Sequence, residues 1–306
     1  MNDSINPNDI VSPLYVTGIT DGEGSFQITI KDNQGKGLTG FKPFLEFKIT
    51  QKKHSIDMLK KIKKFSDCGR ISIDNRKSGT IKYVVTKNED LVTKIIPHFD
   101  IYPLVTSKYL NYSDFKSAAL CIKEKSHFTI KGIQELRNIK LKMNKNRSIQ
   151  DKFNYCWSKP INLYSNWVQG FIDGEGSFQC EFHISKSKKK NIIVNFSLQI
   201  NQNNHDIAVL DGIKKFFRAG YFKPKYDIKD INYCINSRRK TTAIWIRDTG
   251  IICKFLDKYP LYTMKNLDYF DWKRLINLKA QSAHHTKEGL AKMLEIRKGM
   301  NKNRRF

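Results

Sequence analysis

The stretch Gly-Ile-Thr-Asp-Gly-Glu-Gly-Ser-Phe-Gln at residues 18–27 returns as Gly-Phe-Ile-Asp-Gly-Glu-Gly-Ser-Phe-Gln at residues 170–179. Eight of the ten positions are identical, and the offset of 152 residues is about half of the 306-residue chain. A repeat of this length indicates that one supersecondary unit occurs twice. We therefore expect two similar halves, each large enough for its own core.

The duplication continues beyond this stretch. Ile-Thr-Gln at 49–51 is matched by Ile-Asn-Gln at 200–202, and Pro-Leu-x-Thr-x-Lys at 103–108 is matched at 260–265. His-x-Thr-x-x-Gly also occurs twice, 157 residues apart, beginning at His127 and at His284. The offset grows from 151 to 157 residues between these blocks, which predicts an insertion in the second copy within residues 203–260.

Hydrophobic periodicity predicts the elements of each copy. In the first copy, a helix over residues 12–22 precedes a strand in which Phe26, Ile28 and Ile30 alternate with polar residues. A second strand, an amphipathic helix, a hairpin and further helices follow, and the second copy repeats this order. The pattern predicts an α+β fold with two α-β-β-α-β-β-α domains and antiparallel strands.

The charge balance indicates the kind of partner. The chain has 55 Lys plus Arg against 29 Asp plus Glu, a formal net charge of +26, which favours a polyanion such as nucleic acid. No apolar run approaches the ~18 residues of a membrane span, so we expect no membrane partner. The six cysteines are scattered and lack zinc-site spacing, which indicates free thiols in a reducing compartment.

The outward faces of the predicted strands also point to nucleic acid. They carry Gln, Asn, Thr, Lys and His, which include the donors and acceptors that base edges and phosphates need. A plain solvated surface is the alternative for these faces. Because the two copies differ at these positions, we expect a long, asymmetric target.

The repeated acidic motif predicts a catalytic centre. Gly18 and Gly22 lie four residues apart, so two such helices can pack closely and bring Glu23 near Glu175. Two adjacent carboxylates repel unless a cation lies between them or one pKa rises, and divalent metals with oxygen ligands serve this purpose. Beside DNA, such metals support phosphodiester hydrolysis. The alternative is a helix-ending turn with solvated acids.

With both motifs, at 16–24 and 168–176, the chain resembles the single-chain LAGLIDADG homing endonucleases. The resemblance runs from about residue 12 to the C-terminus. It implies that the two motif helices form the domain interface and that two four-stranded, saddle-shaped sheets cover duplex DNA. It further implies cleavage of both strands across the minor groove with 3′ overhangs. Thr20 departs from the motif, which has an aliphatic residue there, so we expect looser packing at that position.

The resemblance also implies roles for particular residues. Both motif acids would bind the catalytic metals, Mg²⁺ or Mn²⁺ with Ca²⁺ as a non-catalytic substitute, and backbone carbonyls would assist them. A polar residue would order water near the metals, and a lysine would support the scissile phosphate or the nucleophilic water. The residues implied are Glu23 and Glu175 with Gly22 and Gly174 for the metals, Gln51 and Gln202 for water, and Lys108 and Lys265 for the phosphate.

We predict DNA contacts at outward strand positions and at basic residues near them. In the first half they are Gln27, Thr29, Lys31, Glu46, Lys48, Thr50, Arg70, Arg76 and Lys82. In the second half they are Gln179, Glu181, His183, Lys186, Lys188, Asn195, Ser197, Gln199, Asn201, Arg238, Arg239 and Arg247. For any single basic residue in these sets, a solvated role is the alternative.

The predicted domains are residues 1–125 for the first half, a helical linker at 126–160, the second half at 161–280, and a basic helical tail at 281–306. We expect a monomer that cuts double-stranded DNA. Two rival functions remain: an RNA maturase that helps its host intron to splice, and a non-catalytic DNA-binding protein. The N-terminus lacks a signal or transit pattern. We therefore expect an organelle-encoded protein, in a mitochondrion rather than a chloroplast.

Overall fold

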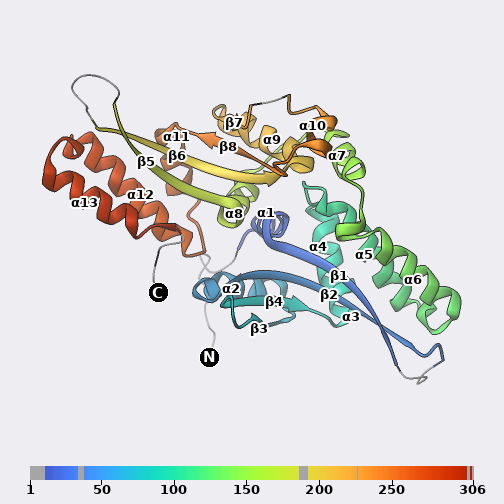
Figure 1. The fold of residues 1–306 in the computed structure, drawn as a ribbon. Coiled ribbons are helices and arrows are strands. Elements are labelled where there is room, and N and C mark those ends of the chain that lie inside the picture. The colour runs from blue at the N-terminus through green and yellow to red at the C-terminus, as the bar shows by residue number, and fades with distance from the viewer. Residues whose placement is uncertain (1–10, 34–37, 186–191, 226, 302–303, 305–306) are drawn as a thin grey trace, which may run out of the picture.

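The protein is described by a computed structural model that covers residues 11–33, 38–185, 192–225, 227–301 and 304. It contains two four-stranded antiparallel sheets with helices packed on them (Figure 1). The strand orders are β1-β2-β4-β3 and β5-β6-β8-β7, so the two sheets share one topology. The predicted α+β fold with two similar halves is confirmed.

The elements of the two halves follow in the same order. The first half and the connection contain α1 (Pro13–Glu23), β1 (Gly24–Asp32), β2 (Phe41–Lys52), η2 (Lys53–Ser55), α2 (Ile56–Ser66), β3 (Arg70–Asn75), β4 (Thr80–Val85), α3 (Asn88–Asp90), η3 (Leu91–Ile95), α4 (Ile96–Ile101), α5 (Lys108–Lys123), η4 (Ser126–Phe128), α6 (Ile130–Lys142), η5 (Asn144–Asn146) and α7 (Ile149–Trp157). The second half contains α8 (Ser165–Glu175), β5 (Gly176–Ile184), β6 (Ile192–Asn203), η6 (Asn204–Asp206), α9 (Ile207–Phe217), β7 (Tyr221–Lys223), α10 (Ile231–Asn236), β8 (Thr241–Ile246), α11 (Thr249–Lys258), α12 (Lys265–Ala280), η7 (Ala283–His285) and α13 (Lys287–Lys298).

Each sheet buries its apolar face under helices. In the first half, Phe26 of β1 and Phe47 of β2 stack with ring centroids 5.1 Å apart and are 1% exposed. Met58 of α2 and Phe115 of α5 belong to the same buried cluster. The second half builds its cluster from the equivalent strands and helices. The period-two alternation therefore identified the buried face of the strands correctly.

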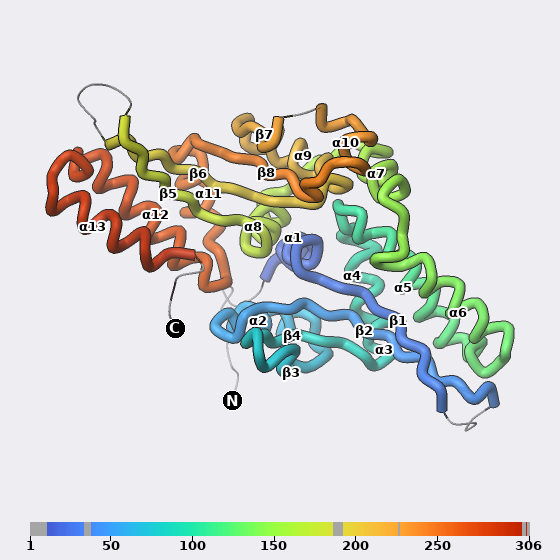
Figure 2. The backbone as a smooth tube through the Cα atoms, viewed as in Figure 1, coloured from blue at the N-terminus to red at the C-terminus, as the bar shows by residue number. Residues whose placement is uncertain are grey.

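Helices α1 and α8 lie side by side at the centre of the molecule, between the two sheets (Figure 2). A Cβ atom on Gly18 would lie 2.1 Å from the carbonyl oxygen of Trp167, and one on Gly170 would lie 2.3 Å from that of Tyr15. The two backbones therefore touch at positions where no side chain fits. This confirms the close helix packing predicted from the glycine spacing.

The two halves differ most between the last two strands of each sheet. Four residues, 76–79, join β3 to β4, whereas residues 224–240, which include α10, join β7 to β8. The insertion predicted within residues 203–260 therefore lies in this connection. Helix α10 packs against α7.

The segments outside the two sheets pack on them. Ile133, Leu136 and Met143, which lie in the predicted linker 126–160, belong to the first core. Met293 of α13, in the predicted tail 281–306, belongs to the second core. Helix α6 is thus part of the first half, as α13 is of the second. Among the described helices, none combines the length and apolar character that a membrane crossing needs.

Candidate functional site

The two motif acids lie at the helix interface. Glu23 is the last residue of α1 and Glu175 the last residue of α8, and each is followed by a glycine that begins a strand. A Cβ atom on Gly22 would lie 3.4 Å from Cγ of Glu175, and one on Gly174 would lie 3.4 Å from Cγ of Glu23. Each acid therefore lies against the motif glycine of the other half.

Both carboxyl groups are held in a poorly solvated place. Burial raises the pKa of Glu175 to about 7, and the charge of Glu23 adds to the shift. Burial also raises the pKa of Glu23, while Lys265 and Lys108 oppose the shift. Two acids that repel each other in this way favour a bound cation, because the cation stabilises both charged forms. This is the electrostatic situation expected from the duplicated motif.

The two predicted lysines point at the motif helices. Nζ of Lys265 donates to the carbonyl oxygens of Ile172, at 3.1 Å, and Gly174, at 2.8 Å. Nζ of Lys108 donates to Gly22 at 3.1 Å and to Thr20. Burial lowers the pKa of both lysines. Each ammonium thus lies beside a glycine carbonyl predicted to assist a metal.

The predicted glutamines line two separate cavities at the paired helices. One cavity, of about 1050 Å³, is lined by Gln51 together with Gly174 and Lys265. The other, of about 440 Å³, is lined by Gln202 together with Gly22, Lys108 and Glu175. Gln51 also donates a hydrogen bond to Glu23.

Each centre therefore combines residues from both halves. Glu23 and Gln51 of the first half meet the glycine and lysine of the second half. Glu175 and Gln202 of the second half meet those of the first. We call them the Glu23 centre (Glu23, Gln51, Gly174 and Lys265) and the Glu175 centre (Glu175, Gln202, Gly22 and Lys108).

Two buried aspartates, which we did not predict as site residues, position the lysine helices. Asp21 accepts hydrogen bonds from the backbone amide of Thr106, at 3.0 Å, and from Nε1 of Trp167 in the other half, at 2.9 Å. Asp173 likewise accepts from the hydroxyl of Tyr15, at 2.6 Å, and from the loop before α12. Their recurrence in both copies of the motif was the available signal. They connect the loops that precede the two lysine-bearing helices, α5 and α12, to the helix interface.

The two centres also contain oxygen atoms that can bind a metal ion, although they hold no large cluster of acidic side chains. Among the residues that the structure describes, no group of three or more His, Cys, Asp and Glu side chains could hold a metal. Glu23, Glu175 and the carbonyl oxygens of Gly22 and Gly174 are hard oxygen donors, which suit Mg²⁺ or Ca²⁺. The residues present therefore fit a divalent cation whose remaining ligands are water or substrate oxygens.

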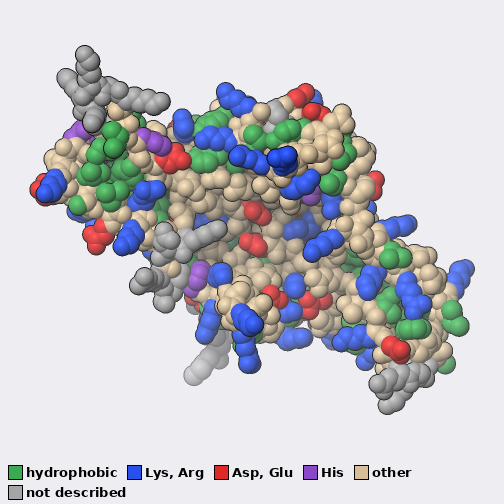
Figure 3. All heavy atoms as spheres, viewed as in Figure 1, with side chains coloured by type: hydrophobic (Ala, Val, Ile, Leu, Met, Phe, Trp, Pro, Cys, Tyr) green, Lys and Arg blue, Asp and Glu red, His purple; other side chains and the backbone are tan. Residues whose placement is uncertain are grey.

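Acidic side chains lie in the hollow at the centre of the face in Figure 3, with Lys and Arg side chains around it. The predicted contact residues, on the strands and near them, differ in their exposure. Those that are exposed are Gln27, Thr29, Lys31, Arg70, Arg76, His183, Arg238, Arg239 and Arg247. Those that are partly exposed are Glu46, Lys48, Thr50, Lys82, Gln179, Glu181, Asn195, Gln199 and Asn201.

Three predicted contacts stand apart from these. Ser197 is 4% exposed, so little of its side chain is accessible in the free protein. Lys186 and Lys188 lie outside the described residues. The other predicted contact residues are at least partly exposed and form a polar surface on each of the two sheets.

Comparisons with known proteins identify the family of this chain. The family model of the LAGLIDADG endonucleases matches residues 16–119 and 168–276. Probable intron-encoded endonuclease 3 of Neurospora crassa is 28% identical over 292 residues, which cover 92% of this chain and 52% of that protein. The chain thus spans about half the length of this relative.

Solved structures show the same fold over nearly the whole chain. The I-SmaMI LAGLIDADG homing endonuclease bound to cleaved DNA superposes with a TM-score of 0.82 at 27% identity, covering 96% of this chain and 98% of that one. I-SmaMI bound to an uncleaved DNA target in the presence of calcium ions gives 0.80 at 27% identity, covering 95% and 99%. The duplicated motif, the two sheets and the family match lead to one conclusion: the chain belongs to the LAGLIDADG endonuclease family.

Proposed function

We propose that this protein is a site-specific endonuclease that hydrolyses both strands of a long, asymmetric DNA target and leaves 3′ overhangs. The observation that carries the proposal is the pair of composite centres, each of which joins an acid and a glutamine of one half to a glycine and a lysine of the other. Two such centres, side by side at the helix interface, suit two scissile phosphates on opposite strands. The DNA in the I-SmaMI complexes supports double-stranded DNA as the substrate.

The residues of each centre have different roles in the proposed hydrolysis. Glu23, Glu175 and the carbonyl oxygens of Gly22 and Gly174 would hold divalent metal ions, Mg²⁺ or Mn²⁺, with Ca²⁺ as a non-catalytic substitute. Bound metal would activate water and stabilise charge on the phosphate. Lys108 and Lys265 place a buried ammonium beside each phosphate, where it stabilises negative charge in the transition state. Gln51 and Gln202 orient water by hydrogen bonding.

The duplication also supports a monomer. One chain supplies both centres and both sheets, so no second copy is needed to contact two half-sites. The name of the Neurospora crassa relative, an intron-encoded endonuclease, supports an intron as the place of the gene, and we propose that this intron lies in an organellar genome. A fungal mitochondrion fits this proposal.

A cleavage selection tests the proposal and identifies the target. Purified protein is incubated with a plasmid library that carries a random DNA segment, in Mg²⁺ and in EDTA, and the cut ends are sequenced. We expect one asymmetric consensus cut in both strands with 3′ overhangs in Mg²⁺, and no cutting in EDTA. If folded protein selects no sequence in Mg²⁺ or Mn²⁺, the proposal is wrong.

A further inference from the structure

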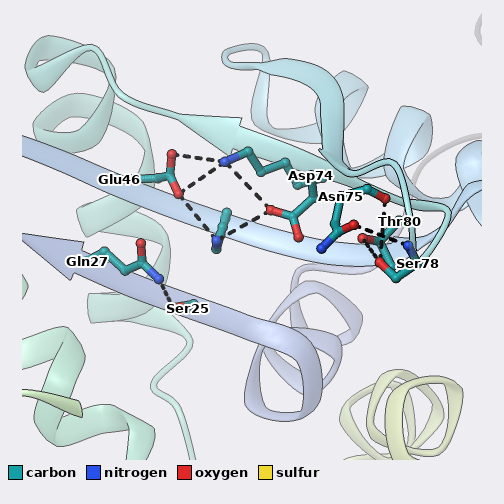
Figure 4. A network of polar contacts seen from close by, with 9 residues as sticks. Ser25, Gln27, Glu46, Asp74, Asn75, Ser78 and Thr80 are labelled. Carbon is teal, nitrogen blue, oxygen red and sulfur yellow. Dashed lines mark hydrogen bonds and ion pairs between the residues drawn. The ribbon is translucent and has the colours of Figure 1, made fainter. Parts of the chain in front are cut away.

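Four charged residues form a closed network on the polar face of the first sheet (Figure 4). Nζ of Lys82 lies 3.2 Å from a carboxylate oxygen of Glu46 and 3.8 Å from one of Asp74. Nζ of Lys48 lies 3.6 Å from Glu46 and 3.5 Å from Asp74. The side chains are 19–26% exposed. We call these four residues the sheet quartet.

Asp74 lies on the same face of β3 as Ser72, which pairs with Lys82, because side chains two residues apart on a strand point to the same face. On β3, Ile73 pairs with Ile81 and Asn75 pairs with Thr80, so Asp74 has no partner on β4. Asp74 thus brings a second carboxylate to two lysines that Glu46 already contacts.

The second half has no quartet at the same positions of its sheet. Glu46 pairs with Gln27 as Ser197 pairs with Gln179, and Lys48 pairs with Ser25 as Gln199 pairs with Ser177. Lys82 pairs with Thr50, and the matching position beside Asn201 is Ala243. The quartet is therefore particular to the first half and is not a requirement of the fold.

Two carboxylates on a surface that contacts DNA are unfavourable unless they bind a group on the DNA, because they repel its phosphates. A carboxylate accepts hydrogen bonds and cannot donate them, so on DNA it needs a donor on a base edge. In the major groove that donor is the amino group of cytosine or adenine, and carboxylates are typical partners of cytosine N4. Lysine ammonium groups match O6 and N7 of guanine in the same groove. One G·C pair presents both kinds of group.

We propose that the sheet quartet selects G·C base pairs in the half of the DNA target that the first sheet contacts. This inference rests on the proposed endonuclease function. In the free protein the four side chains satisfy one another, and their net charge is zero. On the target, Glu46 and Asp74 accept from cytosine amino groups while Lys48 and Lys82 donate to guanine. An A·T pair has the adenine amino group for a carboxylate but lacks the adjacent O6 and N7 acceptors of guanine, so it matches the two lysines less well and binds more weakly.

The strand geometry predicts where these base pairs lie. Lys48 and Glu46 precede Gln51 of the Glu23 centre by three and five residues on β2. At ~3.3 Å per residue these distances are about 10 and 16 Å, or about three to five base pairs at ~3.4 Å each. The selected G·C pairs are therefore expected about three to five base pairs from the Glu23 centre, on the side of the first half.

The test compares base preferences of the wild type and of charge-matched variants in the random-library cleavage selection. Glu46→Gln and Asp74→Asn each remove one carboxylate from the quartet. Glu89→Gln removes one charge elsewhere, from an exposed residue that pairs with Lys87, and so controls for net charge. The double variant Glu46→Gln with Lys82→Gln leaves the net charge unchanged. Thermal unfolding of each variant checks that it is folded.

We expect the wild type to require G·C at these positions, and the Glu46→Gln and double variants to relax that preference by roughly tenfold or more. Asp74→Asn should relax it at the same or an adjacent pair. Preferences in the other half-site, and all preferences of Glu89→Gln, should stay as in the wild type. A wild-type target without G·C there, or variants that keep the wild-type preference, overturns the inference. A wild type that selects no target instead contradicts the proposed function.

Discussion

Asp206 of the second half accepts the backbone amide of Ser107 in the first half at 2.7 Å, directly before the helix that carries Lys108. It also accepts the hydroxyl of Ser107, at 3.1 Å, and the thiol of Cys156, at 2.9 Å. Although burial acts to raise the pKa of Asp206, hydrogen bonds from His205 and these donors hold it below its usual value. The lysine of the Glu175 centre is therefore positioned from across the interface.

Replacing Asp206 should loosen this connection. The amide of Asp206→Asn carries no charge, and its NH₂ group cannot accept the hydrogen bonds that Ser107 and Cys156 donate. We therefore expect the free energy of unfolding to fall by about 1–3 kcal/mol. At the matching position, Ser55 accepts the amide of Met264 at 3.3 Å, and Ser55→Ala should cost less, about 1 kcal/mol. Denaturant unfolding of both variants measures this. Equal losses would show that the carboxylate has no special role.

The first motif contains a buried hydroxyl that the second motif lacks. Thr20 is 0% exposed, and Oγ1 of its side chain has no hydrogen-bond partner among the described residues, whereas Ile172 stands at the matching position. We expect Thr20→Val to raise unfolding free energy by about 1 kcal/mol and Ile172→Thr to lower it by about 1–3 kcal/mol. Denaturant unfolding of the two variants checks both signs. A stability loss in Thr20→Val would show that the hydroxyl is satisfied.

His98 should make the protein less stable in mild acid. Burial lowers the pKa of His98 to about 4, against an ordinary value of 6.5. The unfolded chain therefore binds a proton below about pH 6.5 while the folded protein does not, so stability is lost as the pH falls from 6.5 toward 4. In His98→Gln, this part of the loss, on the order of 1–2 kcal/mol at pH 5, should disappear. Denaturant unfolding at pH 7.5 and pH 5 compares the two proteins, and identical losses would contradict the assignment.

The interface between α1 and α8 has no room for one added methyl group at Gly18, so adding one should lower the stability of the protein. A Cβ on Gly18 would meet a backbone carbonyl at 2.1 Å, so Gly18→Ala forces α1 and α8 apart and should cost about 1–3 kcal/mol or more. Gly250→Ala is the control, because its Cβ would meet a single side-chain atom at 3.4 Å. Thermal unfolding should separate the two variants clearly. The interface account is wrong if Gly18→Ala is as stable as Gly250→Ala.

The sequence predicted most of the architecture because local pattern and repetition determine it. Alternation at Phe26 and Ile28 identified the buried face, and the offset of the repeats located the insertion. What the repeat could not show is which copies of the site residues meet. Gln51 and Lys108 belong to one copy, yet the fold brings Gln51 to Lys265, because the two motif helices lie side by side.

Other features depend on packing that a periodic pattern does not contain. Alternation places Asp74 on the same face of β3 as Arg70, but it does not show that Asp74 contacts Lys48 and Lys82, which lie on two other strands. Asp206 looks like an ordinary charged residue after a strand, and its partner Ser107 is 99 residues away in the chain. Contacts of this kind become visible only when the two halves are placed together.

The central claim is that two composite centres, one with each motif acid, cut the two strands of DNA. The most direct measurement is cleavage of the selected target, with each strand end-labelled, by the wild type, Glu23→Gln and Glu175→Gln in Mg²⁺. The account predicts that each variant loses double-strand cleavage and binds the target within about threefold of the wild type, since about 0.6 kcal/mol of binding energy is lost at most. Cutting of both strands by both variants at the wild-type rate would contradict it.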